Sequence, residues 1–106
     1  MRMIIKSALN DLRSQLNKLY GERLVKLMLF GSQARDDADA GSDIDILVVL
    51  KQPVNSGDEI TRACPVTASL SLKYDLVISC VYVSEDRFKT EQSPLLINVR
   101  REGVMI

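Results

Sequence analysis

Two aspartates separated by one residue stand at the start of an aliphatic segment. Asp43 and Asp45 flank Ile44, and the residues that follow up to Leu50 are all aliphatic. Because side chains alternate along a β-strand, both carboxylates are expected on one face, with Ile44 on the other. Like charges this close repel each other, so a fold that keeps both ionised usually supplies a cation. Oxygen ligands without histidine or cysteine favour Mg²⁺ or Mn²⁺, and such a pair suits a nucleoside triphosphate with its metal.

A glycine and a serine precede this pair by a gap of ten residues. Gly31 and Ser32 follow an apolar run that ends at Phe30, so they are expected to form a turn at the end of a strand. Backbone N–H groups in such a turn, together with the Ser32 hydroxyl, suit phosphate oxygens, and glycine allows a close approach. Arg35, the only cation between residues 31 and 50, is expected to neutralise a leaving pyrophosphate or to pair with a neighbouring aspartate.

Each of these features also has an ordinary structural explanation. Gly-Ser alone forms turns, and Asp-x-Asp alone is common at solvated strand ends. Asp36, Asp37 and Asp39 fit a solvated acidic loop. The combination of both motifs, their gap and the aliphatic strand favours a nucleotide site. The chain contains no histidine, which excludes a Ser-His-Asp arrangement and histidine-containing zinc sites.

Composition places the chain among globular proteins. Its 106 residues are 46% hydrophobic and 26% charged, with zero net charge, so residues 1–106 are expected to form one domain. No apolar run approaches the ~20 residues that span a bilayer, and the N-terminus lacks a signal-peptide pattern, so a cytoplasmic protein is expected. Zero net charge argues against broad nucleic-acid binding. Cys64 and Cys80 are too few and too far apart for a disulfide framework or a zinc cluster.

Hydrophobic periodicity predicts alternating helices and strands. Helices are expected over residues 4–20, 56–74, 85–91 and 95–102, with a helical turn near residues 33–35 and strands over 24–30, 44–50 and 75–83. Pro65 is expected to kink or split the second helix, whereas Gly21, Ser93-Pro94 and Gly103 supply helix boundaries. This order predicts an α/β (α+β) fold, with a small mixed β-sheet flanked by helices.

The motifs resemble the signature of the nucleotidyltransferase superfamily that includes DNA polymerase β. Gly31-Ser32, ten intervening residues and Asp43-x-Asp45 carry this resemblance. The Ala34-Arg35 pair, the short chain and the tail from Asn98 to Gly103 resemble in particular its minimal nucleotidyltransferase branch. The loop departs from the family pattern at Gln33 and Asp36, where many members carry Arg and Gly.

The resemblance implies a metal site and a reaction. It implies two Mg²⁺ ions held by Asp43, Asp45 and a third carboxylate on a neighbouring strand, for which Asp75 is the match. The alternative for Asp75 is a turn residue between a helix and a strand. The implied reaction moves AMP from ATP to a hydroxyl, with Asp75 as a candidate proton acceptor.

The resemblance also implies a partner, because minimal nucleotidyltransferases are typically encoded with a helical HEPN protein and several act as antitoxins that add AMP to this toxin. A hydroxyl on a HEPN-like partner is therefore the first expected acceptor. Two alternatives remain open: an antitoxin with a weak or inactive site that acts by binding alone, and a small-molecule adenylyltransferase. Apolar surface on residues 4–20 and 95–104 predicts docking of a partner or a homo-oligomer.

Overall fold

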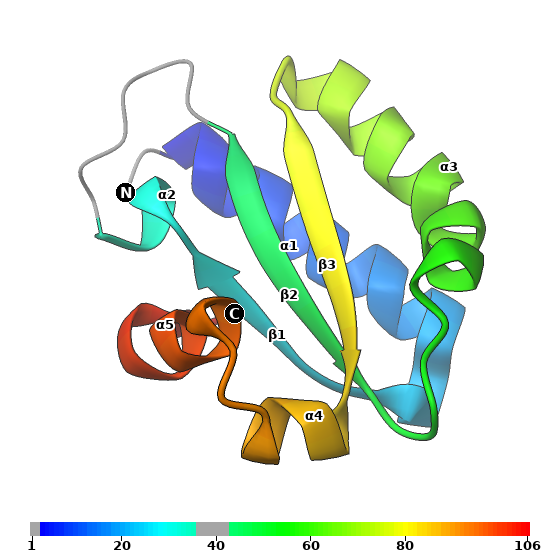
Figure 1. Cartoon of the computed structure of the whole chain (residues 1–106). Coiled ribbons are helices and arrows are strands. Elements are labelled where there is room, and N and C mark those ends of the chain that lie inside the picture. The colour runs from blue at the N-terminus through cyan, green and yellow to red at the C-terminus, as the bar shows by residue number, and fades with distance from the viewer. Residues whose placement is uncertain (1–2, 36–42) are drawn as a thin grey trace.

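The structure is a computed structural model that describes residues 3–35 and 43–106, and Figure 1 shows its elements along the chain. The elements are α1 (Met3–Tyr20), η1 (Gly21–Arg23), β1 (Leu24–Phe30), α2 (Ser32–Arg35), β2 (Ile44–Leu50), α3 (Ser56–Tyr74), β3 (Ile78–Ser84), α4 (Glu85–Thr90), α5 (Pro94–Glu102) and β4 (Val104–Met105). Strands β1 and β2 have the predicted bounds.

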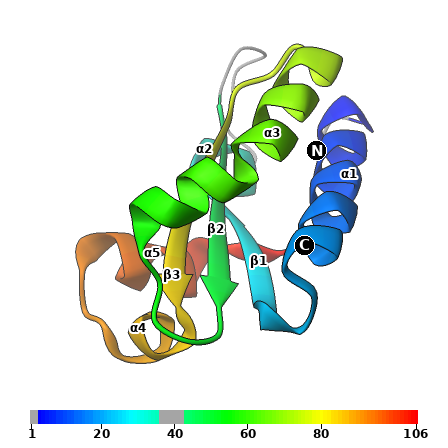
Figure 2. The ribbon, with the colours of Figure 1, turned by 90° about the vertical axis from the view of Figure 1, so that its right-hand side faces the viewer.

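The four strands form one mixed sheet in the order β3-β2-β1-β4. Strand β1 is antiparallel to both β2 and β4. Strands β2 and β3 are parallel, and α3 connects them. Figure 2 shows α1 on one side of the sheet and α4 with α5 on the other. The predicted small mixed sheet flanked by helices is therefore confirmed.

Strand β2 is covered on both faces, which explains its unbroken aliphatic sequence. The side chains of Ile44, Ile46, Val48 and Leu50 pack in the cluster that contains the buried residues of α1 and α3. Leu47 and Val49 pack in a second cluster with residues of α4 and α5. All six side chains are fully buried. The odd-numbered positions of β2 therefore face the α4–α5 side of the sheet.

Helix α1 buries one stripe of side chains against the sheet. Ile5, Leu9, Leu12 and Leu16, spaced three or four residues apart, are all buried, as expected for an amphipathic helix. Gly21 follows with a φ of 56°, so the predicted stop at this glycine is confirmed. No helix in the described residues is long and apolar enough to cross a membrane.

A buried carboxylate joins the two helices on this face. Glu59 of α3 is only 3% exposed. Its carboxylate accepts hydrogen bonds from the Tyr20 hydroxyl at 3.1 Å and from the Arg23 guanidinium at 2.8 Å. Arg62 donates a further bond to the same carboxylate at 2.9 Å. This network fixes the end of α1 and the following η1 against the first half of α3.

Three sequence-based expectations differ from the structure. Helix α3 runs unbroken from Ser56 to Tyr74 with Pro65 inside it, so the predicted split is wrong. Pro65 is exposed, and water can satisfy the carbonyl that loses its partner there. Strand β3 begins at Ile78, not at residue 75. Gly103 ends α5 as predicted, but the residues after it form the unpredicted strand β4. A strand this short has too few residues to show a periodic pattern in the sequence.

Candidate active site

The end of β1 and the start of β2 bring Gly31 against the carboxylate of Asp45. Phe30 pairs with Asp45 across the two strands, and Gly31 is the next residue. Gly31 has a φ of 75°, a conformation that side chains with a Cβ rarely adopt. A Cβ built on Gly31 would lie 2.5 Å from Asp45 Oδ2. Glycine is therefore favoured here both by the backbone and by the position of the carboxylate beside it.

Asp43 and Asp45 lie on the α4–α5 side of β2, at the end where the strand begins. Ile44 between them is fully buried on the opposite side, and its N–H donates to the Val77 carbonyl at 2.8 Å. Asp43 is exposed and Asp45 is half-buried. Figure 1 shows this start of β2 at the same end of the sheet as α2 and the start of β3.

The surroundings of Asp45 disfavour its charge. Burial raises the pKa of the Asp45 carboxyl above its ordinary value, and the neighbouring Asp43 carboxylate raises it further. A cation beside the pair would relieve both effects, because it replaces lost hydration and offsets the repulsion between the carboxylates. The donors are oxygens only, which suits Mg²⁺ or Mn²⁺. These two side chains therefore fit the metal that a triphosphate carries.

Helix α2 begins directly after Gly31 and continues the turn at the end of β1. The N–H of Ala34 donates to the Gly31 carbonyl at 3.1 Å. Gln33 is only 7% exposed, so this amide, at a position where many family members carry Arg, is buried in the fold. The side chains of Ser32 and Arg35 lie outside the described residues, as do Asp36, Asp37 and Asp39. Phosphate binding by Ser32 and Arg35 therefore stays a prediction.

Asp75 lies at the C-terminal cap of α3. Its φ and ψ are 52° and 48°, a left-handed conformation, and its N–H donates to the Ser71 carbonyl. This is a common way to end a helix, and aspartate tolerates it better than most residues. Within residues 3–35 and 43–106, no three His, Cys, Asp or Glu side chains are grouped so that they could hold a metal ion. The structure thus brings Asp43 and Asp45 together but does not add Asp75 to them.

Ser79, which no sequence motif indicates as a site residue, lies beside Asp45 on the neighbouring strand. Ser79 of β3 pairs with Asp45 of β2 in parallel register, and its side chain is exposed. Paired residues of neighbouring strands project from the same face of a sheet. The sequence does not indicate this neighbour, because α3 separates the two strands and packing sets their register.

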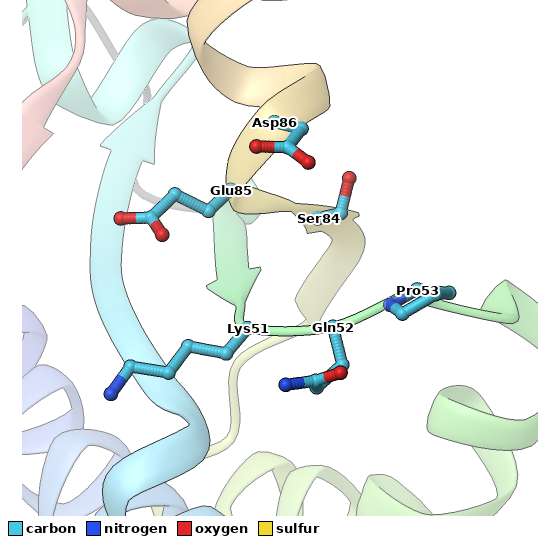
Figure 3. Close-up of a pocket in the computed structure, with 6 residues that line it drawn as sticks. All are labelled: Lys51, Gln52, Pro53, Ser84, Glu85 and Asp86. Carbon is cyan, nitrogen blue, oxygen red and sulfur yellow. The ribbon is translucent and has the colours of Figure 1, made fainter.

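A cavity of about 600 Å³ lies at the opposite end of β2 and β3. It is lined by Lys51, Gln52, Pro53, Ser84, Glu85 and Asp86. Figure 3 shows that the side chains of Lys51, Glu85 and Asp86 are spread around the cavity and do not converge on one point. Because these residues lie at or directly after the C-terminal ends of β2 and β3, the cavity is separate from the carboxylate pair at the start of β2.

Comparisons with known proteins agree with this geometry. A family model described as a nucleotidyltransferase domain matches residues 9–102. Two proteins of Methanocaldococcus jannaschii, each named "Putative protein adenylyltransferase", are similar to the chain. One is 28% identical over 98% of this chain and its own full length. The other is 39% identical over 79% of this chain and 74% of its own length.

Solved structures share the fold at low sequence identity. A toxin–antitoxin complex with AMP-PNP contains a chain that matches with a TM-score of 0.63 and 19% identity, over 89% of this chain and 68% of its own length. A "putative nucleotidyltransferase" of Sulfolobus solfataricus matches with a TM-score of 0.56 and 20% identity, over 99% and 86% of the two chains. The expected fold is thereby confirmed, and the family match covers both the glycine turn and the aspartate pair. The chain belongs to the nucleotidyltransferase domain family and is a nucleotidyltransferase.

Proposed function

We propose that this chain transfers AMP from ATP to a hydroxyl on a partner protein in a Mg²⁺-dependent reaction. The contact between Gly31 and Asp45 carries the proposal. It places the glycine turn at the end of β1 directly beside a carboxylate that favours a cation. A triphosphate with its metal ion needs both groups at one point.

Asp43 and Asp45 would hold the metal, and the Gly31 turn would receive phosphate oxygens. Bound Mg²⁺ would neutralise the charge of the triphosphate and lower the pKa of an attacking hydroxyl. The half-buried position of Asp45 limits competition by water for this carboxylate, whereas the exposed Asp43 leaves the site open to a substrate. The buried Ile44 fixes both carboxylates, because its side chain cannot leave the core without exposing apolar surface.

The transfer makes one bond and breaks one bond. The acceptor hydroxyl oxygen bonds to the α-phosphorus of ATP, and the bond from that phosphorus to the oxygen bridging to the β-phosphate breaks. Pyrophosphate leaves with this electron pair, and the hydroxyl proton passes to water on the open face. The chain therefore contributes position and charge complementarity and forms no covalent bond to the nucleotide.

The proposed acceptor is a hydroxyl on a HEPN-like toxin, with the chain acting as antitoxin. Two lines support a protein acceptor. Two similar proteins are named "Putative protein adenylyltransferase", and matching structures come from toxin–antitoxin complexes. The apolar side chains that such a partner would cover are exposed on α1 and near the C-terminus. They are Met3 and Ile4 on α1, Leu95 and Ile97 on α5, and Val104 and Met105 on β4.

Labelled ATP tests the proposal. The chain is incubated with Mg²⁺, a purified HEPN protein, and ATP labelled at either the α- or the γ-phosphate. We expect label from α-labelled ATP on the partner, no label from γ-labelled ATP, and no transfer by the Asp43→Asn/Asp45→Asn variant. Transfer of γ-label would contradict AMP transfer and indicate a kinase.

The same experiment separates the alternative functions. Tight binding to the partner without any label would indicate an antitoxin that acts by contact alone. Label on a small molecule, with none on protein, would indicate a small-molecule adenylyltransferase. Transfer that survives in the double Asn variant would exclude Asp43 and Asp45 as the metal ligands.

A further inference from the structure

The register of β2 and β3 determines which side chains can stand beside the aspartate pair. Ile44 pairs with Ile78, and Asp45 pairs with Ser79. The N–H of Ile44 also bonds to the Val77 carbonyl at 2.8 Å, which places Val77 next to Asp43. Neighbouring strands lie ~4.8 Å apart, and paired residues share a face. A side chain that joins the two carboxylates from this neighbouring strand must therefore come from position 79 of β3 or from position 77 directly before it.

Neither position carries an acid. Val77 is apolar and 57% exposed, and Ser79 is exposed on the same face. Apolar side chains cannot bind a metal, whereas a serine hydroxyl is a neutral and weak oxygen ligand. Ser79 is thus the only one of the two that offers an oxygen to whatever binds beside Asp45.

Asp75 stands earlier in the chain than these positions and belongs to a different element. Its left-handed backbone ends α3, and both its own N–H and that of Leu76 donate to the Ser71 carbonyl. The last two residues of α3 are also held against α1, because the Tyr74 hydroxyl and the Lys73 amino group both donate to Asp11. To reach the strand position beside Asp45, Asp75 would have to break this helix end.

We infer that Ser79 is a residue of the active site and occupies the place on β3 from which a third carboxylate would reach the metal beside Asp45. This inference rests on the proposed function. It means that β2 and β3 present two carboxylates and one hydroxyl to the substrate. Asp43 and Asp45 would hold a first divalent ion together with the triphosphate. No residue of β3 would supply an acidic ligand to a second ion, which would therefore bind weakly.

Titration with Mn²⁺ in the presence of a non-hydrolysable ATP analogue tests this inference, with free Mn²⁺ followed by electron paramagnetic resonance. We expect wild type to bind one ion tightly and the next weakly. Ser79→Asp should strengthen the binding of the second ion by ~10-fold or more, because each added carboxylate ligand raises affinity for hard cations. Ser56→Asp, which adds the same charge at the distant start of α3, should bind Mn²⁺ as wild type does.

A second variant covers the case in which three adjacent carboxylates prevent Ser79→Asp from folding. Ser79→Cys introduces no charge until a metal binds, and a thiolate prefers a soft ion. With the ATP analogue present, we expect Ser79→Cys to gain a thiolate-to-Cd²⁺ absorption band that wild type, with its own Cys64 and Cys80, does not show. Absence of this band in the folded variant would overturn the placement of Ser79.

The remaining outcomes separate this inference from the proposed function. If Asp75→Asn weakens Mn²⁺ binding as strongly as Asp45→Asn does, Asp75 is the third ligand and the inference is wrong. If folded Ser79→Asp gains no affinity while Asp45→Asn still loses it, the inference fails and the proposed function stands. If Asp45→Asn binds Mn²⁺ like wild type, the proposed metal site itself fails.

Discussion

Replacement of Gly31 by alanine should separate the stability of this fold from its activity. The Cβ introduced by Gly31→Ala would lie 2.5 Å from Asp45 Oδ2. Ordinary van der Waals contact requires the carboxylate to retreat by roughly 1 Å. A carboxylate at the end of a side chain can make this movement at little cost, but a metal ligand displaced by this distance is no longer positioned for transfer.

The expected magnitudes follow from these two effects. An L-residue in the left-handed region costs about 1–2 kcal/mol, and Gly31 has a φ of 75°. This cost should lower the melting temperature by roughly 4–8 °C per kcal/mol. A misplacement of ~1 Å can reduce a reaction rate by ~10²-fold. We therefore expect a modest loss of stability and a loss of AMP transfer of about that order.

Gly21→Ala is the matched control. Gly21 also has a positive φ, 56°, but a Cβ there meets no atom within 4 Å. It should show the strain of the backbone without any displacement of a carboxylate. We expect Gly21→Ala and Gly31→Ala to lose similar free energies of unfolding in urea, while only Gly31→Ala loses Mn²⁺ affinity and transfer. A Gly31→Ala variant that transfers AMP at the wild-type rate would refute the argument that this contact positions Asp45.

Three further predictions concern single side chains. Asp75→Gly should raise the free energy of unfolding by up to ~1 kcal/mol in urea denaturation, because glycine adopts the left-handed cap without strain. The variant should transfer AMP at the wild-type rate, and a loss of transfer would indicate that Asp75 belongs to the active site. Burial raises the pKa of Glu59, but hydrogen bonds from Arg23 and Tyr20 lower it more, and the net shift is downward. The ionised carboxylate therefore contributes stability above the ordinary carboxyl pKa, and this contribution is lost as the pH falls through the lowered value. Glu59→Gln should cost about 1–3 kcal/mol at pH 7 in urea denaturation and less in acid, and an equal cost at both would contradict this sign. In EDTA, Asp45→Asn should raise the melting temperature, because burial and Asp43 raise the pKa of the Asp45 carboxyl and disfavour its charge. Solvent screening keeps the gain in stability below ~1 kcal/mol. A lowered melting temperature would show that the charge is not disfavoured.

Local patterns in the sequence predict most of this sheet. The bounds of β1 and β2 follow from aliphatic runs that end at Gly31 and shortly before Pro53. Alternation along β2 places Asp43 and Asp45 on one face without knowledge of the rest of the fold. The glycine turn and the aspartate pair were therefore predictable as candidates for one site. Their contact depends on the pairing of Phe30 with Asp45.

The end of α3 could not be predicted in the same way. Asp75 precedes a β-branched segment, which is typical of a strand start, but the preceding residues are held by a distant helix. The Lys73 amino group lies 2.9 Å from Asp11 Oδ2, across 62 residues of sequence. Such long-range contacts determine where the helix ends, and they cannot be inferred from the local sequence pattern. The same limit applies to Ser79, whose position beside Asp45 depends on the register of two strands that α3 connects.

Anomalous diffraction from Mn²⁺, in crystals grown with a non-hydrolysable ATP analogue, tests the central claim most directly. We predict a Mn²⁺ peak within coordination distance of the carboxylates of Asp43 and Asp45, with triphosphate oxygens beside the Gly31 turn. A peak in the cavity lined by Lys51, Glu85 and Asp86 at the other end of β2, with no metal at the aspartate pair, would contradict it.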